Sequence, residues 1–382
     1  MDLQRFRALL SDEGQSLLAA LGETGGERGS RAAATAALWQ SGPALVAAAE
    51  EQVRLRGLAA AKFGEHAARM YLTPDIVELS SHLAVSEYKL HRVLHEIGVV
   101  LIDTMCLGSG VDALVLGWSH HTMGVDPDPL TVEMAAANAP ALDTPMLFPT
   151  AEDLTAFDSQ GEAVFIDLVR RPAADGTHDP ESYEPPLSWA LERVRTTGLG
   201  WIRLAPDVQT DVLADVLADV PTDAASAPRR PDEVEWISYQ GVVQELVLWF
   251  GFGAWGEEVA VSVRKATLLP AGVSLTARDL PEPSVRPLGR YLYVPDPAVV
   301  HAGLVAEVAE DIAGGLLDGG DTLLTSDELR QTPFATAYEV VGLLPVGGGG
   351  RPRTDASVEF VVGAAKGTAA VLAVPVRFPL AP

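Results

Sequence analysis

The sequence predicts an α/β protein with a mostly parallel sheet, a helical segment before it and a small mixed segment after it. Two observations lead to this prediction. From about residue 99, short apolar runs alternate with spacers long enough for a helix, a pattern typical of buried parallel strands joined by helices. Before residue 96, leucines and alanines recur at helical spacing without strand-like alternation. The fold class should therefore be α/β.

The elements are expected in three domains, because one hydrophobic core seldom organises more than about 300 residues and the chain has 382. We place a helical domain at residues 1–95 and the sheet domain at 96–269. A Pro- and Gly-rich change of composition after Pro270 begins a third, α+β domain at 270–382. The expected strands are Val99–Met105, Thr122–Val125, Pro145–Phe148, Ala163–Val169, Gly200–Ala205, Val234–Tyr239 and Val259–Leu269.

Charge is distributed unevenly. The formal net charge is −25, and residues 96–265 alone carry 28 acidic and 9 basic side chains. This argues against general nucleic-acid binding, which depends largely on cations that neutralise phosphates. The charge does not exclude a local basic site, because residues 1–95 are nearly neutral and contain 10 basic side chains. A polyanion such as RNA is therefore expected to approach through residues 1–95 or the Arg286–Arg290 region.

Cysteine content and hydropathy indicate the compartment. A single cysteine, Cys106, allows no intrachain disulfide and no cysteine-built zinc site. Residues Met1–Arg7 are charged from position 2, and no apolar stretch reaches the length of a membrane span. We expect a cytoplasmic protein without a membrane segment. His91 and His95 stand four apart with no evident third ligand, so no metal is expected.

The segment from Val99 to Asp126 carries the chemistry. An apolar strand runs into a turn with Gly108 and Gly110, a helix is expected to start near Val111, and a second strand ends in Asp126. Glycine lets the backbone pass close to a ligand, and the acid at the second strand can accept both ribose hydroxyls. Both dinucleotides and S-adenosylmethionine are bound this way. Asp103 on the first strand favours the cationic S-adenosylmethionine, because it would repel a pyrophosphate.

Several motifs resemble a known family. Asp103, Cys106, Gly108, Gly110 and Asp112 resemble the first motif of class I S-adenosylmethionine-dependent methyltransferases, in the branch related to RNA cap guanine-N2 methyltransferases. Three further segments resemble that family's second, third and fourth motifs: Val125–Pro129, Ala151–Asp153 and Val164–Asp167. Longer segments are similar to bacterial proteins that pair such a domain with a THUMP-like carboxyl-terminal domain: Thr177–Trp189, Leu248–Gly251, Gly289–Pro297 and Thr332–Glu339.

The resemblance implies a Rossmann-like fold and methyl transfer from S-adenosylmethionine, with an RNA base amino group as acceptor. It assigns Asp167 as the catalytic residue that orients the acceptor. It assigns the cofactor to seven residues: Asp103, Gly108, Ser109, Gly110, Asp126, Pro127 and Asp153.

Two departures from the family pattern leave alternatives open. The usual acid slot of the first motif holds Thr104, with Asp103 one position early, and a one-residue offset on a strand can aim a side chain at the opposite face. The proline expected after the fourth strand is absent from Asp167–Arg170. A protein that keeps the fold but works as a binding or scaffold module is therefore the main alternative. A dinucleotide-dependent oxidoreductase is a weaker one, because no hydride partner or polarising residue is evident.

Overall fold

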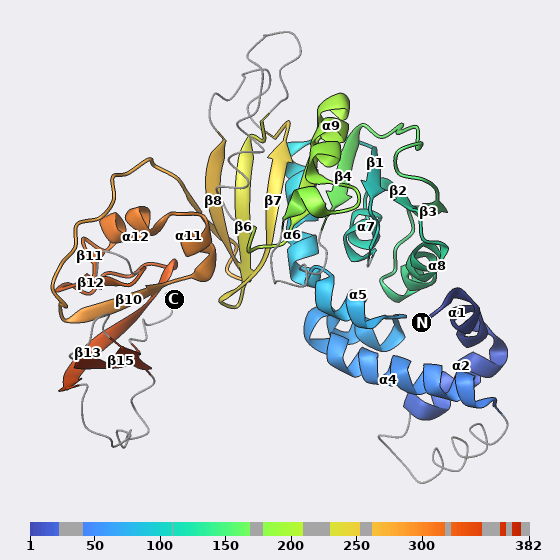
Figure 1. Cartoon of the computed structure of the whole chain (residues 1–382), viewed down its shortest axis with the longest axis horizontal. Coiled ribbons are helices and arrows are strands. Elements are labelled where there is room, and N and C mark those ends of the chain that lie inside the picture. The colour runs from blue at the N-terminus through green and yellow to red at the C-terminus, as the bar shows by residue number, and fades with distance from the viewer. Residues whose placement is uncertain are drawn as a thin grey trace. The chain divides into compact units, whose positions relative to one another are not determined.

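The computed structural model describes residues 1–22, 41–108, 110–168, 179–208, 230–252, 262–317, 322–345, 360–363 and 369–375. These form two compact units (Figure 1). The first comprises Met1–Pro231 with Leu248–Glu258, and the second Asp232–Val247 with Val259–Pro382. Among the described residues, no helix combines the length and the apolar character that crossing a membrane requires.

The first unit begins with helices, as the sequence predicts. They are α1 (Leu3–Leu10), α2 (Asp12–Gly22), α4 (Pro43–Phe63), the 3-10 helix η2 (Gly64–Arg69), α5 (Pro74–Leu79) and α6 (Leu83–Glu96). Side-chain caps define several starts: Thr73, for example, accepts a hydrogen bond from the Ile76 amide at the start of α5. In Figure 1 the blue helices α1, α2, α4 and α5 gather at one end of this unit.

A parallel sheet forms the centre of the first unit. Its strands are β1 (Leu101–Met105), β2 (His121–Asp126), β3 (Leu147–Ala151), β4 (Ala163–Asp167) and β5 (Gly200–Leu204), in the order β3-β2-β1-β4-β5. Every neighbouring pair among them is parallel. The predicted α/β class with a parallel sheet is confirmed. The strand order reverses between β1 and β4, where sheets of this kind bind ligands at the carboxyl ends of the strands.

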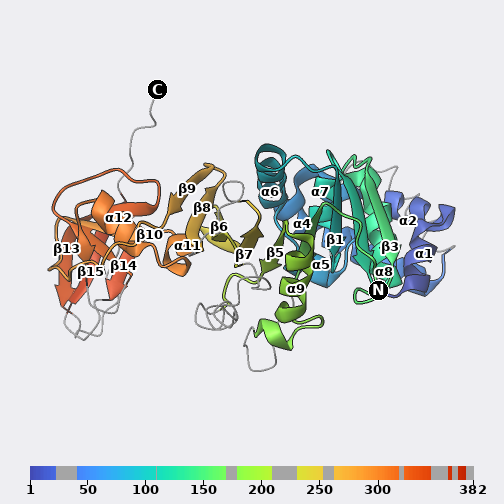
Figure 2. The same cartoon turned by 90° about the horizontal axis from the view of Figure 1, so that it is seen from above.

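Helices connect and cover these strands. Helix α7 (Val111–Leu116) follows β1, and α8 (Pro129–Asn138), continued by the 3-10 helix η3 (Ala139–Ala141), follows β2. The short η4 (Pro180–Ser182) precedes α9 (Leu187–Thr197), which contacts β4 and β5, whereas α8 contacts β2 and β3. Seen from above, α9 lies away from α1 and α2, towards the β5 edge (Figure 2).

The second unit contains two groups of strands. The first is β6 (Glu233–Tyr239), the start of β7 (Val242–Phe250), β8 (Val263–Leu269) and β9 (Val273–Thr276), in the order β7-β6-β8-β9. Strands β7 and β9 are additions to the sequence-based prediction. Gln240 and Gly241, both with positive φ, form the tight turn between β6 and β7.

The second group is a six-stranded antiparallel sheet. In sheet order its members are β11 (Gly315–Leu316), β12 (Leu324–Ser326), β10 (Tyr291–Pro295), β13 (Ala335–Pro345), β15 (Ala369–Pro375) and β14 (Phe360–Gly363). Helices α11 (Pro297–His301) and α12 (Val305–Asp311) complete this α+β arrangement. The division of the chain thus differs from the expected boundaries at 96 and 270. The amino-terminal helices belong to the same unit as β1–β5, and β6, β8 and β9 belong with the carboxyl-terminal strands.

Candidate functional site

The glycine turn after β1 has the backbone geometry that its sequence predicts. Cys106, Gly108 and Gly110 all have positive φ, and Gly110 is the N-cap of α7. A Cβ at Gly110 would lie 3.1 Å from the Ala135 Cβ of α8, so a larger residue is disfavoured by conformation and by space. Ser109, predicted to hold the cofactor, lies outside the described residues. The turn brings backbone amides to the carboxyl end of β1.

Asp126 lies at the end of β2, next to this turn. Its Oδ2 accepts a hydrogen bond from the Gly108 amide at 3.3 Å, and its Oδ1 accepts one from the Asp128 amide at 2.9 Å. Pro127 is exposed between the two acids. Asp128 caps α8 by accepting bonds from the Leu130 and Thr131 amides. The predicted neighbours Gly108 and Asp126 are therefore in contact.

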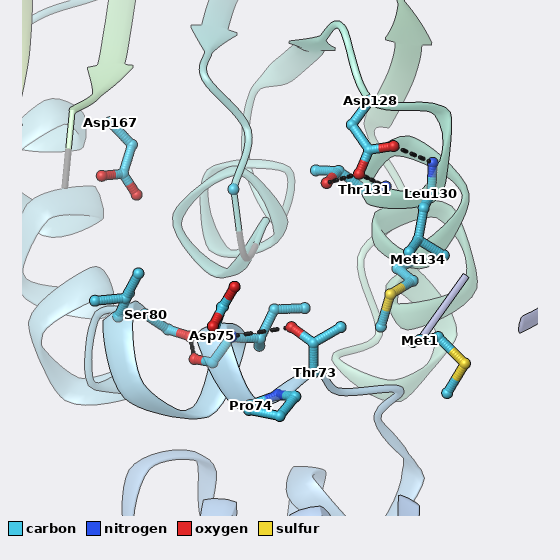
Figure 3. A pocket seen from close by; sticks show the side chains of 13 residues that line it. Met1, Thr73, Pro74, Asp75, Ser80, Asp128, Leu130, Thr131, Met134 and Asp167 are labelled. Carbon is cyan, nitrogen blue, oxygen red and sulfur yellow. Dashed lines mark hydrogen bonds between the residues drawn. The ribbon is translucent and has the colours of Figure 1, made fainter. Parts of the chain in front are cut away.

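A cavity of about 500 Å³ opens beside the glycine turn. Figure 3 shows Asp167 and Ser80 on one side, Asp128 and Thr131 on the other, and Thr73 to Asp75 below. Its lining comes from the turn, β4, α5, α8 and the amino terminus: Met1, Thr73, Pro74, Asp75, Ile76, Leu79, Ser80, Gly108, Asp128, Leu130, Thr131, Met134 and Asp167. Three of these described residues are carboxylates and none is Lys or Arg. One of the three, Asp167, is paired with a buried arginine, and the other two, Asp75 and Asp128, leave a net acidic lining that favours a cationic ligand.

Asp167, the predicted catalytic residue, ends β4 and lines this cavity. A Cβ at Gly108 would lie 3.8 Å from its Oδ2, so the carboxylate borders the glycine turn. The same oxygen accepts a hydrogen bond from Arg203 Nη1 at 2.9 Å, and the Asp167 side chain is only 10% exposed. Asp167 is therefore a buried, ion-paired carboxylate at the cavity wall.

A second buried ion pair lies behind the glycine turn. Lys89 Nζ of α6 is 2.7 Å from Oδ1 of Asp112 on α7, and the Ser81 hydroxyl donates to Asp112 Oδ2 at 2.7 Å. Burial alone would raise the pKa of Asp112, but the charges of Lys89 and Arg203 lower it below its usual value. Neither Lys89 nor Arg203 belongs to a motif that the sequence shows. The available signal for Arg203 was a charged residue inside the apolar strand Gly200–Leu204.

Asp103 is not among the residues that line this cavity. It is almost fully buried, and its Oδ2 accepts hydrogen bonds from the Ser159 hydroxyl at 2.6 Å and the Gly161 amide at 2.8 Å. Both donors belong to the loop before β4. The carboxylate thus fixes a loop of the sheet, and the assignment of Asp103 to the cofactor stays a prediction from the resemblance.

Asp153 is exposed in a turn after β3. Its Oδ1 accepts hydrogen bonds from the hydroxyl and the amide of Thr155, which lower the pKa of Asp153. Neither Asp153 nor Pro127 is among the residues that line the cavity. Their assignment to the cofactor stays a prediction from the resemblance.

The basic side chains expected to meet RNA already have partners within the protein. Arg290 pairs with Glu339 at 2.9 Å, and Arg286 lies 3.7 Å from Asp327. Every Lys or Arg described within residues 1–95 is ion-paired with a carboxylate or hydrogen-bonded to a backbone carbonyl: Arg5, Arg7, Arg54, Arg56, Lys62, Arg69, Lys89 and Arg92. An RNA partner would have to compete with these contacts.

The chain is similar to known proteins in sequence and in fold. Residues 2–59 match a family described as a domain of unknown function (DUF8688). The chain is 27% identical, over 297 residues and 76% of each chain, to an uncharacterized S-adenosylmethionine-dependent methyltransferase of Mycobacterium tuberculosis, strains CDC 1551 and H37Rv. A crystal structure of a proposed methyltransferase from Porphyromonas gingivalis W83 superposes with a TM-score of 0.63 at 17% identity, covering 81% of this chain and 77% of that one.

The fold is the Rossmann-like fold of methyltransferases. The prediction of that fold is thereby confirmed, and the mycobacterial relative agrees with the predicted enzyme class and cofactor. The THUMP-like character of the carboxyl-terminal strands and the RNA acceptor stay predictions.

Proposed function

We propose that the chain is an S-adenosylmethionine-dependent methyltransferase whose cofactor binds at the glycine turn and the acidic cavity beside it. The observation that carries the proposal is the contact of Gly108 with Asp126 at the edge of a cavity lined by three carboxylates and no described Lys or Arg. A sulfonium and an amino group suit such a lining, whereas the pyrophosphate of a dinucleotide would be repelled by it. The same cavity therefore disfavours the oxidoreductase alternative.

The chain's own residues would mainly position the reactants. S-adenosylmethionine supplies an already activated methyl group, so alignment and exclusion of water are what the protein adds. Asp126 would accept the ribose hydroxyls, and Gly108 leaves room for the methionine moiety. Asp167, at the cavity wall, would accept a hydrogen bond from the acceptor and orient it for in-line attack.

For the acceptor we propose an amino group of an RNA base. The support is the resemblance of Asp103–Asp112 and Val125–Pro129 to the cap guanine-N2 branch, together with the position of Asp167 beside Gly108. The test is transfer of a labelled methyl group from S-adenosylmethionine to RNA, with protein and small-molecule fractions as controls. Label that appears only in protein or small molecules would refute RNA as the acceptor, but it would still support methyltransferase activity.

A binding module without turnover is the second candidate. The specific observation in its favour is the ion pair with Arg203, which already engages the Asp167 carboxylate. In that case the chain would bind S-adenosylmethionine but transfer its methyl group to none of these fractions. Transfer to any of them that is lost in Asp167→Asn would exclude the scaffold alternative.

A further inference from the structure

Arg203 connects two walls of the cavity. It lies on β5 and is only 3% exposed. Its Nη1 donates to Asp167 Oδ2 at 2.9 Å, and its Nη2 donates to the Leu79 carbonyl oxygen at 2.7 Å. Asp167 ends β4 and Leu79 ends α5, and both line the cavity. Figure 3 shows Asp167 on the same side of the cavity as Ser80, the residue after Leu79. One side chain therefore holds the sheet wall and the helical wall together.

The guanidinium group is suited to this connection. Its nitrogens lie in a rigid planar fork, so two donors are presented in fixed directions at once. A lysine at the same place would keep the charge but lose the second fixed donor. A charge-assisted bond in a buried environment is also stronger than an exposed one, which restricts the carboxylate further.

A neighbouring ion pair, between Lys89 and Asp112, also contacts the segment at the end of α5. Ser81, two residues after Leu79, donates to Asp112, and Asp112 pairs with Lys89. All four charged side chains, Lys89, Asp112, Asp167 and Arg203, are nearly buried, two positive and two negative. The end of α5 and the segment just after it are thus held by two buried ion pairs, and Arg203 restrains Asp167.

We propose that Arg203 is a positioning residue that aims the Asp167 carboxylate at the place where the transferred methyl group lies. Arg203 does not line the cavity, so it acts through Asp167 and through the Leu79 carbonyl. This inference rests on the proposed function, because it needs the cofactor to occupy the cavity. It also explains why an active enzyme would keep the Arg203–Asp167 ion pair, since the Asp167 carboxylate must be held in one orientation.

Two cofactor analogues test the inference without a known acceptor. In sinefungin a carbon that bears a protonated amine replaces the sulfonium sulfur of S-adenosylmethionine, so the amine stands where the methyl group lies. S-adenosylhomocysteine has no group at that position. The ratio of their dissociation constants therefore measures whether a carboxylate faces the methyl position. The measurement is calorimetric titration of the full chain with each analogue.

We expect the wild-type chain to bind sinefungin about tenfold more tightly than S-adenosylhomocysteine, as one charge-assisted hydrogen bond would give. Arg203→Lys should lose this preference while its affinity for S-adenosylhomocysteine stays the same. Asp167→Asn should lose it to the same extent. Arg290→Lys, an exposed arginine of the second unit, is the matched control and should keep the wild-type ratio.

Three results would overturn the inference: a wild-type chain without the preference, an Arg203→Lys variant that retains it, or a variant that loses both affinities equally, as a purely structural role predicts. A wild-type chain that binds neither analogue would instead contradict the proposed function. If circular dichroism shows that Arg203→Lys does not fold, Arg203→Gln/Asp167→Asn replaces it. Because Arg203 is inferred to act through Asp167, the double variant should have the same affinities for sinefungin and S-adenosylhomocysteine as Asp167→Asn alone. A lower affinity of the double variant for either analogue would overturn the inference.

Discussion

The cavity wall of the first unit and the Arg286–Tyr293 segment of the second unit both combine arginines with neighbouring acids, but they do so differently. At the cavity, Arg203 and Lys89 are buried and fix carboxylates next to the glycine turn. In the second unit, Arg290 is exposed over Tyr291, while the rings of Tyr291 and Tyr293 are buried in the sheet. A charged side chain that is removed from water is stable only when an opposite charge or hydrogen bonds compensate it. The buried ion pairs of Lys89 and Arg203 therefore hold their carboxylates in defined positions, whereas the exposed pair of Arg290 does not need to.

The largest effect is expected from breaking the buried pair at Lys89. Lys89→Met leaves Asp112 charged in the interior and should lower the free energy of unfolding by about 3–5 kcal/mol. Urea denaturation measures it. Lys89→Met/Asp112→Leu removes both charges and should recover most of the loss, and a double variant as unstable as the single one would show that packing, rather than charge, causes it.

The same pair predicts a dependence of stability on pH. The pKa of Asp112 is lower in the folded chain than its ordinary value of 3.8. Its contribution is therefore complete above pH 3.8 and is lost as the pH falls through the folded pKa. Below pH 4, wild-type stability should fall more steeply than that of Lys89→Met, in which one of the charges that lower this pKa is missing. Parallel curves of unfolding free energy against pH would contradict this.

At the ribose position, Asp126→Ala should weaken S-adenosylmethionine binding by about 1–3 kcal/mol, the cost of leaving ligand hydroxyls unpaired. Calorimetry measures the change, and Asp153→Ala provides a comparison at an exposed acid outside the cavity lining. An affinity that is unchanged in Asp126→Ala would mean that another group holds the ribose.

The turn itself should be sensitive to a single methyl group. Gly110→Ala places a Cβ at φ 72° and 3.1 Å from the Ala135 Cβ, and the left-handed conformation alone costs about 1–2 kcal/mol. Thermal unfolding should show the loss of stability. Gly272→Ala, at a positive-φ turn with open space around it, should show only the conformational part. Equal losses in the two variants would mean that contact with α8 is unimportant.

The smallest effect is expected at the second unit. Arg290→Met breaks an exposed ion pair with Glu339, and such pairs contribute little. Urea denaturation should show no measurable change, in contrast to Lys89→Met with the same incoming side chain. A loss comparable to that of Lys89→Met would remove the distinction between the two regions.

The fold was predictable where local sequence decides it. Strands β1, β4 and β5 are almost fully buried because the central strands of a parallel sheet are covered on both faces, so each appears in the sequence as a mostly apolar run. Strand β3, at the edge of the sheet, is partly exposed, and its bounds Leu147–Ala151 overlap only partly with the expected run Pro145–Phe148. Strand β7 was missed because its start, Val242–Gln244, is partly exposed and the turn at Gln240–Gly241 was not recognised. The division into two units depends on contacts between distant segments, which composition does not show.

The site was predictable only where residues are close in sequence. Gly108, Gly110 and Asp126 follow from the order of strand, turn, helix and strand. The partners of the acids could not be predicted, because Asp103 meets Ser159 56 positions later and Arg203 meets Leu79 124 positions earlier. Those contacts decide which carboxylate borders the cavity, since strand alternation alone permits either face for Asp103.

The most direct test of the account is calorimetric titration of the full chain with S-adenosylmethionine and, separately, with NAD. The contact of Gly108 with Asp126 and the acidic lining of the cavity predict that S-adenosylmethionine binds at one site per chain and that NAD binds weakly or not at all. NAD binding that is tighter than S-adenosylmethionine binding, or binding of neither, would contradict the assignment of this cavity to the methyl donor.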